Sequence, residues 1–271
     1  MTDIHIHQIF YDEKTRRELE PGFLPLDNSA NERPDWREYW PMRNFLMRNT
    51  LVEDDFYGFL SSRFEAKTGS SFQQIKEFLD DATKRGVDAA IFSPMWDLHA
   101  LFWNVFEQGD YFHPGLLRAG QEFFNAIGKN VAVTELVTDS RNSIFSNYFA
   151  AKPRFWRKWL EINEQLFRIA EGPPTPLRGL LRTSANWRPG EQVEMKVFIM
   201  ERLASFLLAT SSDLSCRSYK VRLPMSNTAF GRFAFEAIVC DALKIAFVEQ
   251  RDAMYKTAFD RIQQQVKEQI G

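Results

Sequence analysis

Residues that could do chemistry gather in one stretch, Thr138 to Leu160, which reads TDSRNSIFSNYFAAKPRFWRKWL. A polar turn there carries Asp139, a β-prone run over 144–151 carries Asn147, and Lys152 precedes the proline that begins a helix. Carboxylate, amide and ammonium groups together can bind a polar ligand and move a proton. In open α/β sheets, ligand sites form where strand ends deliver polar groups into a turn. The stretch is therefore expected to form the floor of a ligand pocket.

The spacing of apolar residues predicts the elements that position this stretch. Alternating or short apolar runs predict strands over residues 4–10, 56–60, 88–92, 131–137, 144–151 and 217–224. Helical spacing and capping residues predict helices over residues 35–49, 72–84, 94–109, 114–127, 153–171 and 193–210, and over 230–269 as one or two helices. Strands separated by helices predict an α/β fold, with a mixed, mostly parallel sheet flanked by helices. We expect one such domain over 1–225, with a helical extension over 226–271 packed on it.

The first predicted strand supplies two further candidates for ligand binding. It carries Gln8 and leads into Tyr11, where a long polar loop begins that runs to Pro34. A loop of this length in a compact domain is more often functional than idle. Gln8 and Tyr11 are therefore predicted to contribute to the pocket.

Two acidic residues on predicted helices have an open role. Asp97 lies near the start of a helix, where capping is its expected task, although a role as catalytic base or in substrate binding is the alternative. Glu201 interrupts the apolar run VFIMERLASFLLA, at the edge of the predicted buried face, and Arg202 lies further round the helix. A carboxylate at the rim of an apolar face is costly unless it is paired or needed. Glu201 is accordingly either a catalytic carboxylate or one half of a buried ion pair with an arginine.

Several common classes of protein are excluded by missing patterns. The chain has no glycine-rich phosphate loop, no G-x-S-x-G and no H-E-x-x-H. It also lacks D-x-D, the carboxylate pair with which many sugar-nucleotide enzymes hold Mg²⁺ or Mn²⁺. No metal ligands are therefore predicted, and the use of a divalent cation is left open.

Bulk composition constrains the compartment and the partners. The formal net charge is −2 over 271 residues, so no nucleic-acid partner is expected. The two cysteines have no metal-binding spacing and are expected to be free thiols in a reducing compartment. No apolar run reaches the roughly 18 residues that a membrane-spanning helix needs. These features predict a cytoplasmic protein.

Four segments, in order, resemble a poorly characterised family of bacterial capsule and O-antigen glycosyltransferases. They are EYWPMRNFL followed by FYGFLSSRF, then IFSP with FEQGDYFH, then NYFAAKPRFWRKWL, and finally FIMERLASFLL. Together they cover roughly residues 36–210. In the family, the turn after the Y-x-G strand usually has a histidine and adjacent arginines, whereas this chain has only Arg63.

The resemblance implies a GT-A-like fold that transfers a sugar from a nucleotide-diphosphate donor to a growing surface polysaccharide. Motif by motif, it implies that Tyr57 and Arg63 belong to the donor pocket and that Asn147 and Lys152 line its centre. It also places Glu201 and Arg202 beside the acceptor or the leaving diphosphate. The acceptor would be a glycan or lipid-linked glycan, met in the cytoplasm or by peripheral association with the inner face of the inner membrane.

Two rival functions are compatible with the same residues. The missing D-x-D favours a non-catalytic sugar- or nucleotide-binding or scaffold domain on the same fold. A glycan hydrolase needs two carboxylates across one cleft, and Asp97, Asp139 and Glu201 are the available candidates. Within the transferase hypothesis, Glu201 or Asp139 would be the catalytic base, and arginines with Lys152 would stabilise the diphosphate.

Overall fold

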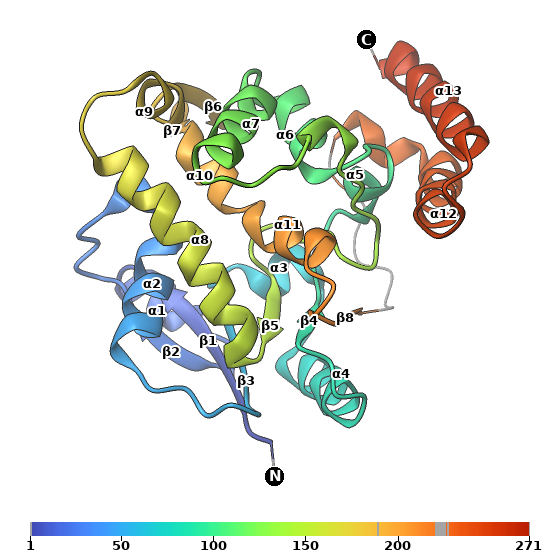
Figure 1. Ribbon diagram of the computed structural model, residues 1–271. Coiled ribbons are helices and arrows are strands. Elements are labelled where there is room, and N and C mark those ends of the chain that lie inside the picture. The colour runs from blue at the N-terminus through green and yellow to red at the C-terminus, as the bar shows by residue number, and fades with distance from the viewer. Residues whose placement is uncertain (1, 189, 220–225, 227, 271) are drawn as a thin grey trace.

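A mixed β-sheet organises the computed structural model, which describes residues 2–188, 190–219, 226 and 228–270 (Figure 1). The sheet has six strands in the order β2-β1-β3-β5-β4-β8. Their bounds are β1 Ile4–Phe10, β2 Leu24–Asp27, β3 Phe56–Ser61, β4 Ala89–Ile91, β5 Phe149–Ala151 and β8 Cys216–Ser218. Among these strands, β5 runs antiparallel to both neighbours and the other pairings are parallel. The predicted α/β fold with a mixed, mostly parallel sheet is confirmed.

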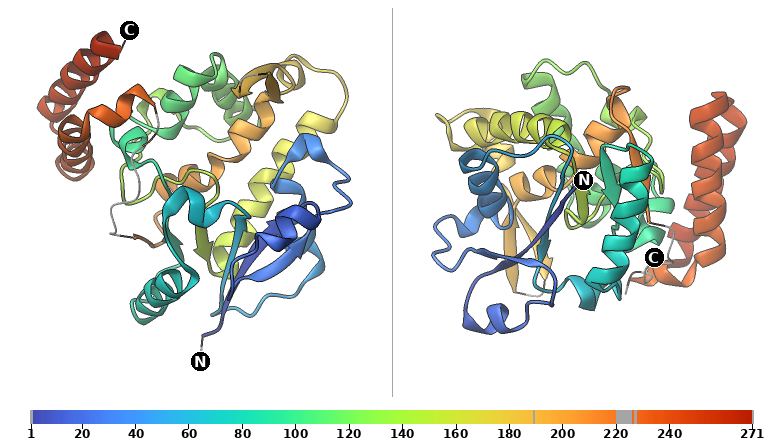
Figure 2. Two further views of the ribbon diagram at one scale, coloured as in Figure 1. Left: turned by 180° about the vertical axis from the view of Figure 1, so that it is seen from behind. Right: turned by 90° about the horizontal axis from the view of Figure 1, so that it is seen from below.

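Helices cover both faces of this sheet, as the two views of Figure 2 show. Strand β3 sends Phe56 and Leu60 to one face, where they pack with apolar residues of α4 (Phe72–Lys84). The alternate residue Phe59 points to the other face, where α8 (Pro153–Glu171) packs and contributes the fully buried Trp156. This period of two is the one expected of a strand buried on both sides.

The remaining helices and strands complete the layers around the sheet. They are α1 Glu13–Arg17, α2 Tyr39–Arg48, α3 Phe64–Thr68, α5 Trp96–Ala100, α6 Val105–Phe112, α7 Leu116–Ala126, α9 Pro176–Leu181, α10 Met195–Met200, α11 Leu203–Thr210, α12 Ala234–Gln250 and α13 Ala253–Ile270, the 3₁₀ helices η1 Pro34–Trp36, η2 Val133–Glu135 and η3 Ala229–Arg232, and the hairpin β6 Ser184–Arg188 with β7 Glu191–Glu194. The helices predicted over 72–84 and 153–171 have these bounds in the structure. The helix predicted over 94–109 is divided into α5 and α6.

The strand predicted over 131–137 is wrong. Residues 133–135 form the 3₁₀ helix η2 instead. Side chains form hydrogen bonds with the backbone N–H and carbonyl groups that a neighbouring strand would otherwise have paired. The amide of Asn104 donates to the carbonyls of Val133 (3.0 Å) and Leu136 (2.8 Å). Gln121 accepts a hydrogen bond from the Val133 N–H at 2.8 Å. Side-chain partners of this kind compete directly with strand pairing.

Two other predicted strands are shorter than expected. The run 144–151 pairs only over β5, because Ser146 and Asn147 adopt positive φ angles of 57° and 54° that a strand cannot accommodate. The strand predicted over 217–224 is present as β8, and residues 220–224 lie outside the described part of the chain. Strand β2 was not predicted; it lies in the long loop after Tyr11 and extends the sheet edge beside β1.

The helix predicted over 193–210 is interrupted at Glu201 and Arg202, between α10 and α11. The guanidinium of Arg202 donates to the Phe198 carbonyl at 2.7 Å. The backbone N–H of Arg202 therefore does not donate to Phe198, as it would in an α-helix. It donates to the carbonyl of Ile199, three residues earlier, at 2.9 Å, which is the hydrogen bond of a 3₁₀ helix. The interruption fixes the backbone at the residue pair whose role was left open.

Helices α12 and α13 form a hairpin at one side of the molecule (Figures 1 and 2). The fully buried Lys244 anchors α12, since its ammonium donates to the carbonyl oxygens of Thr138 (2.6 Å) and Phe102 (2.8 Å) and to that of His99. Asp241 accepts a hydrogen bond from the Ser140 N–H at 2.8 Å. The predicted C-terminal extension is thus tied to the turn that begins the Thr138–Leu160 stretch.

Replacing Lys244 by methionine is expected to destabilise the protein by about 2–4 kcal/mol, because it leaves buried carbonyl oxygens without a donor. Urea unfolding at pH 7 measures this change. The control is Lys76→Met, which removes an exposed pair with Asp80 and is expected to cost less than about 1 kcal/mol. Equal stability of the two variants would contradict the anchoring role of Lys244.

Candidate functional site

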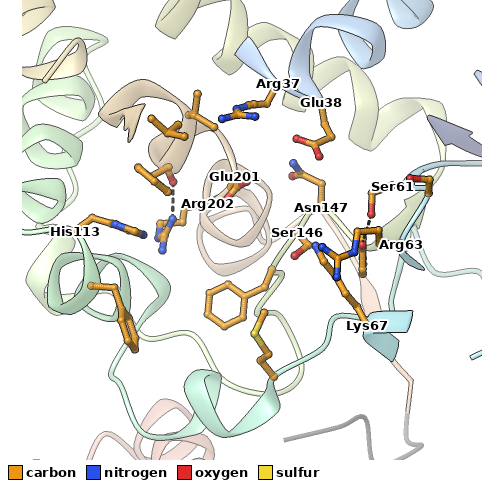
Figure 3. Close-up of a pocket in the computed structure, with 18 of the residues that line it drawn as sticks. Arg37, Glu38, Ser61, Arg63, Lys67, His113, Ser146, Asn147, Glu201 and Arg202 are labelled. Atoms are coloured by element: carbon orange, nitrogen blue, oxygen red, sulfur yellow. Dashed lines mark hydrogen bonds between the residues drawn. The ribbon is translucent and has the colours of Figure 1, made fainter. Parts of the chain in front are cut away.

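A pocket of about 700 Å³ opens at the carboxyl-terminal ends of the parallel strands (Figure 3). It lies where the parallel strands β1, β3 and β4 end and where β5 begins. The strand register explains this meeting point, because Ile9 pairs with Ser61 and Ile91 pairs with Phe149. Residues just beyond these pairs therefore lie close together at the same end of the strands. This is the position at which open α/β sheets bind ligands.

Most pocket-lining residues come from five segments. These contribute Tyr11 and Thr15 after β1, Asn31, Pro34, Arg37 and Glu38 around η1, Ser61, Ser62, Arg63 and Lys67 after β3, Phe145, Ser146, Asn147 and Tyr148 before β5, and Val197, Phe198, Glu201 and Arg202 at the α10–α11 junction. The α5–α6 region adds Met95, Leu98, Gln108, Phe112 and His113. Chain segments far apart in sequence thus converge on one cavity.

The pocket brings opposite charges together. Arg37, Arg63 and Lys67 supply positive charge, and Glu38 and Glu201 supply carboxylates. Figure 3 shows Arg63 and Lys67 on one side of the cavity and Arg202 with His113 on the other, with Glu201 between them. Such a cavity suits a ligand with an anionic group at one end and hydroxyl groups at the other.

Glu201 is the most unusual ionisable group of the pocket. Burial raises its pKa to about 7; the neighbouring Arg202 opposes this shift and Glu38 adds to it. Within the described residues, no hydrogen bond or ion pair holds the Glu201 carboxylate, although its side chain is only partly exposed to the cavity. A carboxylate with a pKa near neutrality can take a proton from a hydroxyl group at physiological pH.

Arg202 does not form an ion pair with Glu201. Its buried guanidinium donates to the carbonyls of Val105 (2.6 Å) and Phe198 (2.7 Å) and to Gln108 Oε1 (2.9 Å). A side chain at Gly109 would lie 2.5 Å from Arg202 Nε, so a glycine is needed where α6 passes this group. Arg202 therefore fixes α6 against the α10–α11 junction and adds positive charge behind the pocket.

His113 lines the pocket in its neutral form. Its ring stacks on Phe198 with centroids 3.8 Å apart. Burial and, to a lesser extent, the charge of Arg202 together lower the pKa of His113 to about 4. At neutral pH the ring is therefore uncharged, and its buried Nδ1 has no hydrogen-bond partner among the described residues.

Strained backbone is concentrated around this cavity. Among the described residues, six that are not glycine have positive φ angles. Five of them line the pocket, and Arg251 at the end of α12 is the exception; the five are Asn31, Arg37, Met95, Ser146 and Asn147. Each such conformation costs on the order of 1–3 kcal/mol and persists where the surroundings demand it. Clustering of this kind is typical of functional sites.

Half of the predicted site residues lie in the pocket. They are Tyr11, Arg63, Asn147, Glu201 and Arg202. The pocket is also lined by Arg37, Glu38 and Lys67, which were not among the predicted site residues. The available signal for Arg37 and Glu38 was the long polar loop that ends just before them, since a loop of that length predicts function.

Two predicted residues are occupied with structural hydrogen bonds outside the pocket. The amide of Gln8 donates to Glu20 Oε1 at 2.9 Å and accepts from the Glu20 N–H at 2.8 Å, which ties β1 to the loop before β2. Asp97 does not cap α5; its buried carboxylate accepts a hydrogen bond from the Ser226 N–H at 2.9 Å. Neither side chain lines the pocket.

Three other predicted residues also lie outside the cavity. Asp139 is buried and paired with Arg141, whose guanidinium lies 2.8 Å from its carboxylate. Tyr57 packs in the core near the start of β3, and Lys152 follows the end of β5, with its ammonium 5.9 Å from the Phe56 ring centroid. Tyr57 therefore lies toward the end of the strands opposite the pocket. Lys152 lies at the same end, because β5 runs antiparallel to its neighbours and Ala151 pairs with Tyr57.

No group of three or more His, Cys, Asp or Glu side chains within the described residues is arranged to hold a metal ion. The pocket carboxylates Glu38 and Glu201 do not form such a set. In the same part of the chain, no helix combines the length and apolar character needed to cross a membrane.

No family model, curated protein or solved structure matches this chain. Its function must therefore be inferred from the pocket itself. The features available for that inference are the position at the strand ends, the two kinds of charge and the raised pKa of Glu201.

Proposed function

We propose that the protein is a GT-A-like glycosyltransferase that moves a sugar from a nucleotide-diphosphate donor to a hydroxyl group of a growing surface polysaccharide. One observation carries the proposal: Glu201, with a pKa near 7, faces the same cavity as Arg63 and Lys67. A base poised near neutrality and cations for a departing diphosphate are the two groups that this transfer requires. The order of the four sequence motifs supports the same reaction.

The proposed reaction balances as one displacement at the anomeric carbon. The acceptor hydroxyl oxygen forms a bond to that carbon, while the bond from the carbon to the diphosphate oxygen breaks with its electron pair. The hydroxyl proton passes to the Glu201 carboxylate and later to water. The nucleoside diphosphate leaves with the added negative charge.

The positive side chains account for the departure of the diphosphate. Arg63 is positioned at the end of β3, and Lys67 follows one turn later in α3. Arginine binds phosphate oxygens through paired N–H groups, and lysine adds a point charge. These residues and Arg37 would stabilise the negative charge of the leaving diphosphate.

The proposed compartment follows from the acceptor. Lipid-linked glycans are assembled at a membrane surface, so the protein would act in the cytoplasm, at the inner face of the inner membrane. Peripheral association with the acceptor would suffice for this reaction.

Nucleotide binding provides the direct test. Calorimetric titration with UDP, GDP and CDP, and with UDP-, GDP- and CMP-sugars, is expected to show binding of at least one nucleotide. Arg63→Gln is expected to weaken that binding about tenfold or more, since a charge-assisted contact is worth roughly 1.5–3 kcal/mol. The control Arg85→Gln removes an exposed arginine at the end of α4, outside the pocket, and is expected to leave affinity unchanged. A folded protein that binds no member of the panel would overturn the proposal.

A glycan hydrolase is the second candidate, because Glu38 and Glu201 are two carboxylates in one cavity. The cluster of Arg37, Arg63 and Lys67 favours the transferase, since hydrolysis of a neutral glycosidic bond releases no phosphate. Release of nitrophenol from nitrophenyl glycosides, in the absence of any nucleotide, would favour the hydrolase.

A further inference from the structure

The side chain of Asn147 has an unsatisfied oxygen in the pocket. Asn147 is 3% exposed, and its Oδ1 has no hydrogen-bond partner among the described residues. Its Nδ2 contacts the sulfur of Met200 at 3.7 Å, and a thioether is only a weak acceptor. Leaving a buried amide oxygen unpaired is costly. This oxygen needs an N–H or O–H group that the pocket does not supply.

The local backbone does not explain why the residue is an asparagine. Ser146 and Asn147 form a tight turn, closed by the Tyr148 N–H bonding to the Phe145 carbonyl at 3.2 Å. At a φ of 54°, glycine would relieve the strain that Asn147 bears. The turn is closed by a backbone hydrogen bond, and the Asn147 side chain contacts Met200 rather than the turn itself. The amide is therefore available for a ligand.

The contact with Met200 places this amide beside the proposed base, because Met200 directly precedes Glu201. Figure 3 shows Asn147 and Glu201 projecting into the same cavity from different segments. Glu201 would take the proton of one ligand hydroxyl, and the Asn147 amide oxygen would accept a hydrogen bond from a second hydroxyl without removing its proton. Two neighbouring hydroxyls of a sugar ring present this combination.

We infer that Asn147 Oδ1 accepts a hydrogen bond from the hydroxyl adjacent to the one that Glu201 deprotonates, so the acceptor is a sugar with a vicinal pair of hydroxyls. This inference rests on the proposed function and specifies its acceptor. A site that pairs a buried amide with a hydroxyl strongly rejects an analogue lacking that hydroxyl. Asn147 is thus assigned as a specificity-determining residue.

Three variants separate the amide from the backbone. Asn147→Gly removes the amide and suits the positive φ, and Asn147→Asp retains an acceptor oxygen. Arg251→Gly is the matched control, since it relieves a φ of 59° outside the pocket. The probes are the methyl glycosides of glucose, galactose and mannose, with the 2-, 3-, 4- and 6-deoxy analogues of the best binder.

Saturation-transfer NMR with the glycosides at millimolar concentration is expected to show binding of at least one of them to the wild-type protein. Asn147→Gly is expected to weaken it about tenfold or more, while Asn147→Asp and Arg251→Gly retain it. One of the deoxy analogues is expected to bind wild-type protein about as weakly as the parent glycoside binds Asn147→Gly, and its binding is expected to be insensitive to that substitution. Unchanged glycoside binding in Asn147→Gly would overturn the inference, and so would the absence of any glycoside binding to folded wild-type protein.

The outcomes distinguish this inference from the function on which it rests. Nucleotide binding without an effect of Asn147→Gly on glycosides would remove the inference and leave the transferase standing. Asn147-dependent glycoside binding without any nucleotide binding would remove the transferase and leave Asn147 as a reader of sugar hydroxyls.

Discussion

Replacing Glu201 by glutamine is expected to lower the turnover number for sugar transfer by about 10²–10⁴-fold, the usual contribution of a general base. Glutamine has nearly the same shape as glutamate but cannot accept the proton. The affinity for the nucleotide donor is expected to stay within about threefold, because Glu201 is not proposed to contact the diphosphate. Steady-state kinetics with the donor and acceptor identified by the binding experiments measure both quantities. Unchanged turnover would remove Glu201 from the mechanism and would favour a different base.

The same variant is expected to be more stable than the wild type at alkaline pH. The folded protein raises the pKa of Glu201 from 4.5 to about 7, so between these values the folded state binds the proton more readily than the unfolded state. The contribution of Glu201 to the free energy of unfolding therefore falls as the pH rises from 4.5 to about 7, and above that range the charged carboxylate destabilises the folded state. Glu201→Gln removes the cost, and we expect a gain of about 1–3 kcal/mol at pH 8 that disappears near pH 4.

Urea unfolding at pH 4 and pH 8 checks this expectation. Glu161→Gln, an exposed position of α8, serves as the control and is expected to change stability by less than about 0.5 kcal/mol at either pH. A variant that loses activity while gaining stability has the pattern of a residue kept for function. A loss of stability at pH 8 would instead assign Glu201 a structural role.

Replacing Lys196 by methionine is expected to destabilise the protein by about 2–4 kcal/mol at pH 7. The ammonium of Lys196 is fully buried and lies 2.7 Å from Asp35, 3.2 Å from Glu171 and 2.7 Å from Glu194. It also lies 4.6 Å from the centroid of the Trp36 ring. Without it, three partly buried carboxylates repel one another. The comparison is Lys158→Met, which breaks an exposed pair and is expected to cost less than about 1 kcal/mol.

The pH dependence gives a second check on Lys196. Hydrogen bonds and ion pairs with Arg33 and Lys196 hold the pKa of Asp35 well below its usual range, and the pKa of Glu171 is also lowered by its partners. Lowered carboxyl pKa values stabilise the fold above the unfolded-state pKa, near 4, and that stability is lost at lower pH. The difference between wild type and Lys196→Met should therefore be large at pH 7 and shrink toward pH 3. A difference independent of pH would point to packing alone.

Loss of Lys196 is also expected to affect the pocket, because Asp35 lies two residues from Arg37. This lysine holds η1 against the start of α10, the helix that leads to Glu201. We expect Lys196→Met to weaken nucleotide binding more than Lys158→Met does. Equal affinities would restrict the role of Lys196 to stability.

Sequence patterns predicted the parts of the fold that depend on local signals. A capping serine, Ser70 or Ser71, and the proline at 153 mark helix starts that the structure reproduces, with Ser71 as the cap of α4. The period-two pattern of β1 likewise predicted its bounds. These features depend on a few neighbouring residues, so a single sequence suffices.

The rest depends on partners distant in sequence. No local pattern indicates that the Asn104 amide would bond to the carbonyl of Val133, or that the Arg202 guanidinium would bond to Val105. The first contact replaces a predicted strand by a 3₁₀ helix, and the second accompanies a break in a predicted helix. Asp139 and Glu201 looked similar in the sequence, and tertiary pairing separates them: Arg141 engages Asp139, whereas Glu201 faces the cavity.

The anchoring of α12 has a consequence for the order of assembly during synthesis. Lys244 bonds to the carbonyl of Thr138, which lies 106 residues earlier in the chain and directly before the turn that leads to Asn147. A ribosome has therefore translated most of the chain before this turn can acquire its buried donor. The nascent protein can form the β1–β3 pairing early, but the floor of the pocket is completed only after the C-terminal hairpin has emerged.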